Sequence, residues 1–164
     1  MSYLIENHTI AFRSTSPHEV ELICALESHH ENNSFILPYD EQRHQQVISS
    51  EEDAHLIIED KVTKSILGFI ILAGLQNEDL SLELRRIVIL SKGQGQGRQS
   101  LQLLKQYCFE VLKFRRLWLD VFDDNARAIN LYASEGFTEE ARLRKVVKQG
   151  DGYRTLLLFS ISAD

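Results

Sequence analysis

The sequence predicts a single α/β domain built on a mixed sheet whose first half is antiparallel. Three apolar runs follow one another between residues 54 and 90 with only short polar segments between them, which is typical of antiparallel strands. Helical patterns then alternate with strands between residues 96 and 137, as in a strand–helix–strand crossover. The 164 residues are 43% hydrophobic and 26% charged, a composition that suits one soluble globular domain over residues 1–164.

The expected order of elements is β-α-α-β-β-β-α-β-α-β-β, and the first three are read as follows. A strand is expected over His8–Ser14. A helix follows, because Ser16 is a suitable N-cap, Pro17 suits the first helical position and Glu19 completes a capping box. A second, shorter helix is expected over Asp40–Ser50.

The middle of the chain supplies three strands and a strong helix. The strands are expected over Ala54–Asp60, Ser65–Leu75 and Leu80–Leu90, which are rich in apolar and β-branched residues. A glycine-containing loop then leads into a helix, where Leu101 and Leu104 begin an apolar stripe at helical spacing.

The last third predicts a strand, a helix and a hairpin. The strand is expected over Arg115–Phe122, and the helix after it begins at a cap formed by Asp123 or Asp124 and ends at Gly136. Two alternating segments joined by a Gly-Asp-Gly turn, within residues 141–161, predict the hairpin.

Charge and cysteine content restrict the class of protein. The net charge of −6 argues against a nucleic-acid partner and fits a cationic substrate better. Cys24 and Cys108 lie in apolar helical patterns and are expected to be reduced thiols of a cytoplasmic protein. The sequence shows no signal peptide and no apolar run long enough to span a membrane. The adjacent His29 and His30 point in different directions on a helix, so no metal site is expected there.

The most unusual segment is "SKGQGQGRQS", Ser91–Ser100, where three glycines at alternate positions join a strand to a helix. Such a junction lets backbone amides close around a phosphate, and the helix dipole favours negative charge there. A Walker loop needs Lys and Ser/Thr after its last glycine, whereas Arg98 and Gln99 follow Gly97. A dinucleotide fingerprint fails as well, because its sixth position, which should be glycine, is Arg98 when counted from Gly93 and Ser100 when counted from Gly95. The loop alone leaves open both a phosphate site and a flexible turn.

A second motif about 30 residues further on narrows the choice. The segment "LDVFDDNARAINLYASEGF" has the pattern N-x-R-A-x-x-L-Y-x-x-x-G-F. With "RRIVILSKGQGQGRQSLQLLKQYCFEVLKFRRLWL" it resembles the GNAT superfamily of acetyl-CoA-dependent N-acetyltransferases, most closely the branch with spermidine and ribosomal-protein N-terminal acetyltransferases. The resemblance is strong over Leu82–Phe137 and looser elsewhere.

The resemblance implies an acyl-CoA N-acyltransferase-like fold with acetyl-CoA as co-substrate and no metal. The strand residues beside the pantetheine arm would be Ile87, Val88 and Ile89. The loop residues expected to hold the pyrophosphate are Gln94, Gly95, Gln96, Gly97, Arg98, Gln99 and Ser100. Asn125 matches the asparagine that hydrogen-bonds the pantetheine arm, and Tyr132 matches the tyrosine that faces the thioester sulfur.

Two positions depart from the family pattern. Gln99 stands where the family commonly has Ala or Gly, so its side chain is expected to point away from the phosphates. Related polyamine enzymes carry a substrate-contacting glutamate where this chain has Leu84, and Glu83 is one residue away. A shift of one residue reverses the face of a strand unless a β-bulge intervenes.

Acetyl transfer requires a neutral amine, an oxyanion donor and a stabilised thiolate. A lysine-like amine is neutral in only about one molecule in 2,500 at pH 7, a cost of roughly 4.6 kcal/mol, so a base is needed. Glu83 is the leading candidate, and the alternative is an exposed residue that pairs with Arg85. A backbone N–H near Val88 or Ile89 could bind the oxyanion if the strand diverges from its neighbour there. Tyr132 would assist the thiolate, or else serve as a core aromatic residue.

The sequence therefore predicts an N-acetyltransferase that uses direct transfer to a primary amine, either of a polyamine-like small molecule or of a protein N-terminus. Two alternatives stay open: an acyltransferase that uses another acyl-CoA, and a non-catalytic CoA-binding sensor. The resemblance also implies a homodimer, because the family often pairs through its terminal strands.

Overall fold

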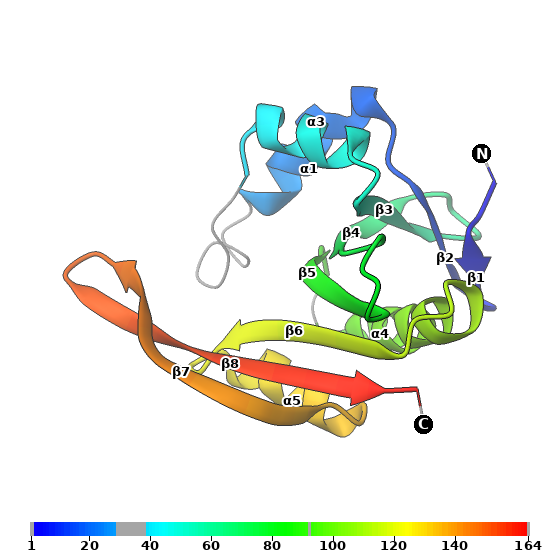
Figure 1. Ribbon diagram of the computed structural model, residues 1–164. Helices are drawn as coiled ribbons and strands as arrows, with labels where there is room; N and C mark the ends of the chain where they lie inside the picture. The colour runs from blue at the N-terminus through cyan, green and yellow to red at the C-terminus, as the bar shows by residue number, and fades with distance from the viewer. Residues whose placement is uncertain (1, 29–38, 92, 164) are drawn as a thin grey trace.

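The computed structural model describes residues 2–28, 39–91 and 93–163 (Figure 1). The strands are β1 (Ile5–Glu6), β2 (Ile10–Ser14), β3 (Asp53–Asp60), β4 (Ile66–Ala73), β5 (Ser81–Ile89), β6 (Arg116–Phe122), β7 (Thr138–Gln149) and β8 (Gly152–Ser162). The helices are α1 (Val20–Glu27), α3 (Glu41–Ser49), α4 (Gln96–Gln106) and α5 (Ala126–Ser134), with two short helical turns, η1 (Pro17–Glu19) and η2 (Tyr107–Val111).

All eight described strands form one mixed sheet in the order β1-β2-β3-β4-β5-β6-β8-β7. The strands from β1 to β5 are antiparallel neighbours, as predicted for the first half of the chain. β5 and β6 are parallel, and α4 makes the crossover between them. The mixed α+β fold predicted from the sequence is therefore confirmed.

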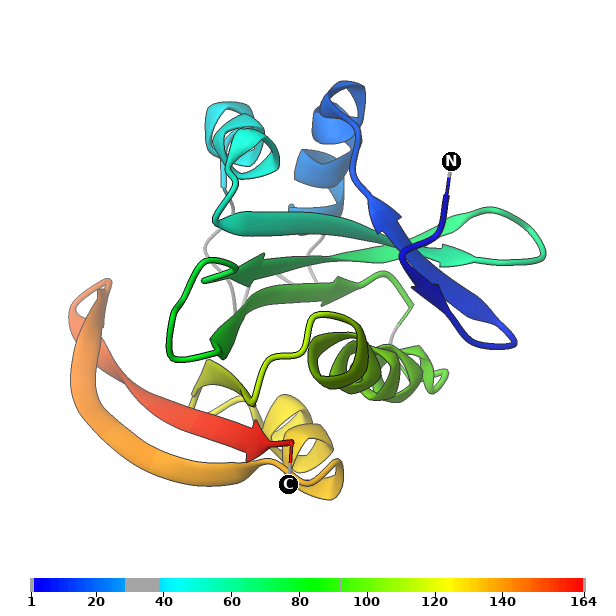
Figure 2. The same ribbon diagram turned by 45° about the vertical axis from the view of Figure 1, so that its right-hand side comes forward.

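Helices cover both faces of this sheet. α1 and α3 lie together over one face, whereas α4 and α5 lie on the opposite side (Figures 1 and 2). The smaller core cluster, which includes Ile23 and Val47, lies under α1 and α3. The larger cluster, which includes Leu82, Leu101 and Leu104, lies on the side of α4 and α5. Residues on opposite faces of β3, β4 and β5 therefore serve two separate cores.

The predicted elements appear in the predicted order, with differences at their ends. β1 was not predicted, because two residues are too few to give a periodic pattern. The first predicted strand begins at Ile10 rather than His8. The predicted cap of α5 was wrong: Asn125, not Asp123 or Asp124, is the N-cap, and its side chain accepts the Ala128 N–H.

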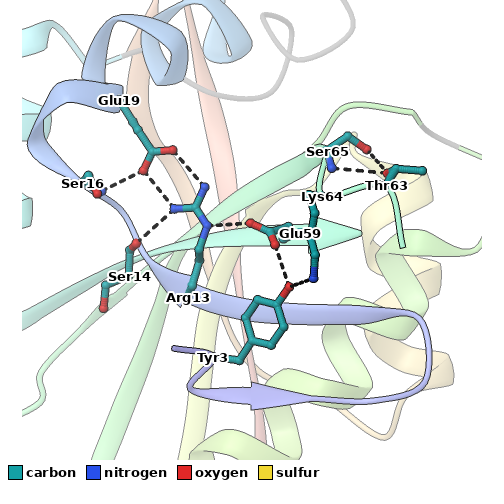
Figure 3. Close-up of polar contacts among 9 residues, drawn as sticks. All are labelled: Tyr3, Arg13, Ser14, Ser16, Glu19, Glu59, Thr63, Lys64 and Ser65. Atoms are coloured by element: carbon teal, nitrogen blue, oxygen red, sulfur yellow. Dashed lines mark hydrogen bonds and ion pairs between the residues drawn. The ribbon is translucent and has the colours of Figure 1, made fainter. Parts of the chain in front are cut away.

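A network around Arg13 fastens the start of the α1–α3 layer to the sheet (Figure 3). The Arg13 guanidinium pairs with Glu19 at 2.9 Å and with Glu59 of β3 at 2.7 Å. The Glu19 carboxylate also accepts the Ser16 N–H at 2.9 Å, the contact expected of the predicted capping box. Tyr3 donates its hydroxyl proton to Glu59 at 2.7 Å, which adds the N-terminal segment. We call these residues the Arg13 network.

The remaining predictions about the fold concern thiols and membranes. Cys24 and Cys108 are both free thiols, and Cys108 is buried. Among the described residues, no helix has both the length and the apolar character needed to cross a membrane.

Candidate functional site

The site begins where β5 and β6 separate. The two parallel strands pair only over Ser81–Glu83 and Arg116–Trp118. β5 then continues to Ile89 and β6 to Phe122 without pairing with each other. The divergence that the sequence could not reveal is therefore present, and it opens a cleft of about 1310 Å³. The cleft is lined by residues from β5, α4, β6, α5 and the β7–β8 hairpin.

β5 contains a β-bulge at the edge of this cleft. Leu84 pairs with Leu72 of β4 and Arg86 pairs with Ile71, so Arg85 is the extra residue of the bulge. The register shift reverses the faces of all later residues of the strand.

The bulge decides which residues share a face with Glu83. In a regular strand, Glu83 would share its face with Ile87 and Ile89. After the bulge, Val88 belongs to the smaller core under α1 and α3, while Ile89 belongs to the larger core with Leu84. Glu83 therefore lies on the α1–α3 side together with Val88.

Alternate backbone N–H groups of β5 point toward the gap beyond Glu83. The Leu90 N–H donates to the Leu67 carbonyl of β4 at 2.9 Å. Because N–H directions alternate along a strand, the Ile89 N–H points to the other side, where β6 has diverged. Of the two oxyanion donors considered from the sequence, Val88 and Ile89, the geometry favours Ile89.

The glycine loop turns the chain from β5 into α4. Gly93 and Gly95 have φ of 85° and 78°, a left-handed conformation that favours glycine, and Gly95 is the N-cap of α4. The Gln99 N–H makes the first intrahelical bond, to the Gly95 carbonyl. The N–H groups of the first three helical residues therefore have no acceptor within the helix, which is the arrangement that binds anions.

Some of the predicted loop residues line the cleft and others do not. Gly95, Gly97 and Arg98 line it, and so does Gly93, which the prediction had left out. Gln94, Gln96, Gln99 and Ser100 do not. The side-chain oxygens of Gln96 and Ser100 are buried without a hydrogen-bond partner.

Two side chains of the loop make contacts with other elements: Arg98 at the wall of the cleft, where Ser134 also lies, and Gln99 outside it. The Arg98 guanidinium donates to Ser134 at 2.8 Å and pairs with Glu135 at 2.7 Å, which joins α4 to the end of α5. Gln99 accepts the hydroxyl proton of Thr9 at 2.7 Å, outside the residues that line the cleft. This contact accounts for a long side chain at a position where the family commonly has a small one.

α5 contributes Tyr132 to the lining of the cleft, and its N-cap residue Asn125 lines the cleft as well. Tyr132 is 8% exposed, and its ring packs against Phe137 and Phe159. Burial, assisted by the charge of Asp120, raises the pKa of Tyr132 to about 12. Tyr132 is thus both a core aromatic residue and a protonated phenol at the cleft.

The two carboxylates near the cleft differ in position. Glu83 pairs with Arg85 at 3.0 Å, the contact that the alternative interpretation expected, although its side chain is 17% exposed rather than fully exposed; it is not among the residues that line the cleft. Asp120 of β6 does line the cleft. Partial desolvation, assisted by the charge of Glu83, raises the pKa of Asp120, while Arg85 opposes the shift.

Asp120 is a residue that the sequence reasoning missed. A signal was present, because alternation in "RRLWLDVF" places Asp120 on the same face as Trp118, and Trp118 pairs with Glu83. Because Asp120 is a carboxylate between Leu119 and Val121 in a largely apolar strand, it could have been considered as a candidate site residue.

Two predictions about metals concern different parts of the chain. His29 and His30 lie outside the described residues. Within the part that the structure describes, no group of three or more His, Cys, Asp or Glu side chains is placed to hold a metal ion.

Comparisons with known proteins agree on one family. Residues 20–137 match the family described as "Acetyltransferase (GNAT) family". The chain is 28% identical over 105 residues to the spermidine N(1)-acetyltransferase of Vibrio cholerae serotype O1, a match that covers 63% of this chain and 60% of that protein. It is 39% identical over 46 residues to the spermine/spermidine N(1)-acetyltransferase of Bacillus subtilis, a match that covers 28% of this chain and 30% of that one. The matched regions therefore span less than two thirds of these curated relatives.

Solved structures share the whole fold. The spermidine N-acetyltransferase from Vibrio cholerae in complex with CoA and spermine superposes with a TM-score of 0.82 at 23% identity, covering 95% of this chain and 96% of that one. A dodecameric structure of the Vibrio cholerae enzyme superposes with a TM-score of 0.77 at 23% identity and covers 95% of both chains.

Proposed function

Because residues 20–137 match it, the chain belongs to the acetyltransferase (GNAT) family, and we propose that it transfers the acetyl group of acetyl-CoA directly to a primary amine. The observation that carries this proposal is the cleft between the diverging strands. One wall holds the start of a helix with free N–H groups, and the other holds Tyr132 and Asn125.

The residues of the cleft suit acetyl-CoA. The left-handed glycines and the free N–H groups at the start of α4 fit a pyrophosphate, held by Gln94–Ser100. Ile87, Val88 and Ile89 would lie along the pantetheine arm. The Oδ1 atom of Asn125 already caps α5 at 3.3 Å from the Ala128 N, so its amide NH₂ would serve the pantetheine arm.

The proton of the amine would leave through a carboxylate on the α1–α3 side. We propose Asp120 beside Glu83, because Asp120 lines the cleft and its raised pKa makes it a better proton acceptor than an ordinary aspartate. Glu83, which is paired with Arg85, would attract the cationic form of the incoming amine. Its negative charge would also keep the pKa of Asp120 raised.

The oxyanion and the thiolate would be stabilised from opposite walls. The Ile89 N–H would donate to the oxyanion, since it faces the gap left by β6. Tyr132 would donate to the departing sulfur. Burial disfavours a bare thiolate as well as a phenolate, so the raised pKa of Tyr132 still permits it to donate a hydrogen bond.

The acceptor we propose is a polyamine. The names of the relatives support this choice, as do the carboxylate of Asp120 in the cleft wall and the nearby carboxylate of Glu83. A peptide N-terminus is the second candidate, supported by the resemblance to ribosomal-protein acetyltransferases. The dodecameric relative supports an oligomer of this chain as well.

Free-thiol release from acetyl-CoA, measured with spermidine, aminoglycosides and short peptides side by side, tests the function. We expect spermidine to raise the release of CoA well above hydrolysis without amine. If CoA binds tightly but no amine raises the release, the CoA-binding sensor replaces the enzyme. The same panel with propionyl-CoA tests the alternative donor.

A further inference from the structure

A buried chain of polar side chains lies under α1 and α3, apart from the residues assigned above. Glu27 of α1 and His44 of α3 are 0% exposed, and His55 of β3 is 5% exposed. His44 Nε2 lies 2.5 Å from Glu27 Oε1, and His44 Nδ1 lies 3.1 Å from His55 Nε2. Thr15 Oγ1 lies 2.8 Å from His55 Nδ1. Together with Arg86, described next, these residues form the Glu27 network.

The other end of this chain reaches the cleft. The Arg86 guanidinium donates to Glu27 Oε2 and stacks on the ring of Tyr39 at 4.1 Å. The Tyr39 N–H donates to Glu27 Oε1 at 3.1 Å. Arg86 lines the cleft, and its side chain is only 11% exposed. The network therefore runs across the sheet from Thr15 to the strand that carries the Ile89 N–H.

One proton on each imidazole satisfies every bond of the network. Glu27 accepts from His44, Arg86 and Tyr39; although burial opposes ionisation, the bonds from His44 and Arg86 keep its pKa low. His44 then donates through Nε2 and accepts at Nδ1 from His55. His55 in turn accepts the Thr15 hydroxyl proton at Nδ1. The direction of the hydrogen bonds is thus uniform and ends on Glu27.

Arg86 is the residue that follows the β-bulge. Without the bulge, Arg86 would share the face of Leu84, inside the larger core, where a charge has no partner. With the bulge, it meets Glu27 on the opposite face. A buried ion pair seldom adds net stability compared with apolar residues of the same size, but it does select one arrangement over another.

We propose that Glu27, held by His44 and His55, is a positioning residue that fixes the β-bulge through Arg86 and so orients Ile87–Ile89 in the cleft. The expected effect of Glu27 on catalysis rests on the proposed function, since the Ile89 N–H would bind the oxyanion. The expected effect of Glu27 on the backbone of β5 is independent of the proposed function.

Amide hydrogen exchange of the free protein tests the positioning directly. In Glu27→Gln, exchange over residues 84–90 should become at least tenfold faster than in the wild type. The matched control is Glu19→Gln, which breaks a carboxylate–guanidinium pair of the Arg13 network and should leave exchange over 84–90 unchanged. His44→Gln, further from the bulge, should give a smaller change in the same direction, and it provides the test if Glu27→Gln does not fold. Equal exchange over 84–90 in the Glu27 and Glu19 variants would overturn the proposal.

Kinetics test the catalytic consequence. Glu27→Gln should lower kcat at least tenfold, with the Kd for CoA within about threefold of the wild type, because the network meets β5 at Arg86, before the strand ends and the pyrophosphate loop begins. Unchanged kcat in a variant with faster exchange over 84–90 would overturn that consequence. If the wild type acetylates no amine, the proposed function fails, while the exchange experiment still decides the positioning.

Discussion

The Arg13 network and the Glu27 network each join the α1–α3 layer to the sheet through a guanidinium and carboxylates. In the Arg13 network, Glu19 and Glu59 are 13% and 10% exposed, and they meet the guanidinium on β2, the strand next to the edge strand β1 (Figure 3). In the Glu27 network, the carboxylate is fully buried, two imidazoles extend the chain, and the guanidinium lies on β5 at the cleft.

The difference separates two uses of the same chemistry. When one carboxylate of the Arg13 network is lost, the guanidinium keeps the other, and the carboxylate side chains are 10–13% exposed, so the effect is expected to be local. Glu27 is 0% exposed and accepts three hydrogen bonds, so its loss leaves all three donors without an acceptor, including Arg86 of β5.

The largest effect is expected from Glu27→Ala. This change leaves Arg86 and His44 without their buried acceptor, so the free energy of unfolding should fall by about 3–5 kcal/mol. Glu19→Ala should lower it by only about 1.5–3 kcal/mol, because the site is partly accessible to water. Urea unfolding followed by circular dichroism measures both values. Equal losses would contradict the distinction between the two networks.

Acid should weaken the two networks in different ranges of pH. Burial, assisted by His44, lowers the pKa of His55 to about 4 from an unfolded value near 6.5. The unfolded chain therefore binds the proton first, and stability is lost as the pH falls from about 6.5 to 4, by roughly 3 kcal/mol in all. The bond from Arg13 lowers the pKa of Glu19, so the Arg13 network weakens only below about pH 4.5.

His55→Gln isolates this contribution. Thermal unfolding of the wild type and of His55→Gln at a series of pH values should give a stability difference that shrinks from pH 6.5 downward. A difference that stays constant between pH 6.5 and 4.5 would place the acid sensitivity outside the Glu27 network.

A smaller effect is expected from Tyr3→Phe in the Arg13 network. The change removes the hydrogen bond to Glu59, so the free energy of unfolding should fall by about 1 kcal/mol. The kcat and the KM for the amine should match those of the wild type, because Tyr3 does not line the cleft. Altered kinetics without further loss of stability would mean that the Arg13 network also reaches the site.

The smallest effect is expected from Gln99→Ala. The variant loses the bond from Thr9, about 0.5–1 kcal/mol of stability, and gains a residue type common in the family at that position. The KM for acetyl-CoA should change by less than about twofold. Thr9→Val is the matched control, since it removes the same bond from the other side; a large rise in KM for Gln99→Ala alone would show that the Gln99 side chain takes part in binding.

The regular elements could be predicted from the sequence because their signals are local. The stripe that begins with Leu101 and Leu104 predicted α4, and the alternation in Arg116–Phe122 predicted β6. The contact that Glu19 makes with Ser16 was predicted from three residues of sequence. Such signals depend on side chains within one turn or one strand.

The parts that could not be predicted depend on pairing between distant segments. The bulge at Arg85 and the divergence after Glu83 are properties of the β4–β5 and β5–β6 ladders, which no local pattern encodes. The proposed role of Asp120 depends on that divergence, since it places Asp120 in the wall of the cleft. The Glu27 network joins α1, α3, β3 and β5, so its members look like unrelated polar residues until the chain is folded.

If one cleft holds both substrates, the acetyl group can move directly between them. Initial rates with acetyl-CoA and spermidine varied together test this transfer, with the acetylated amine identified by mass spectrometry. We expect intersecting double-reciprocal lines, one acetylated amine for each CoA released, and a kcat lowered by about 10²-fold or more in Tyr132→Phe. Parallel lines, which indicate an acetylated enzyme, or CoA release without acetylated amine would contradict direct transfer.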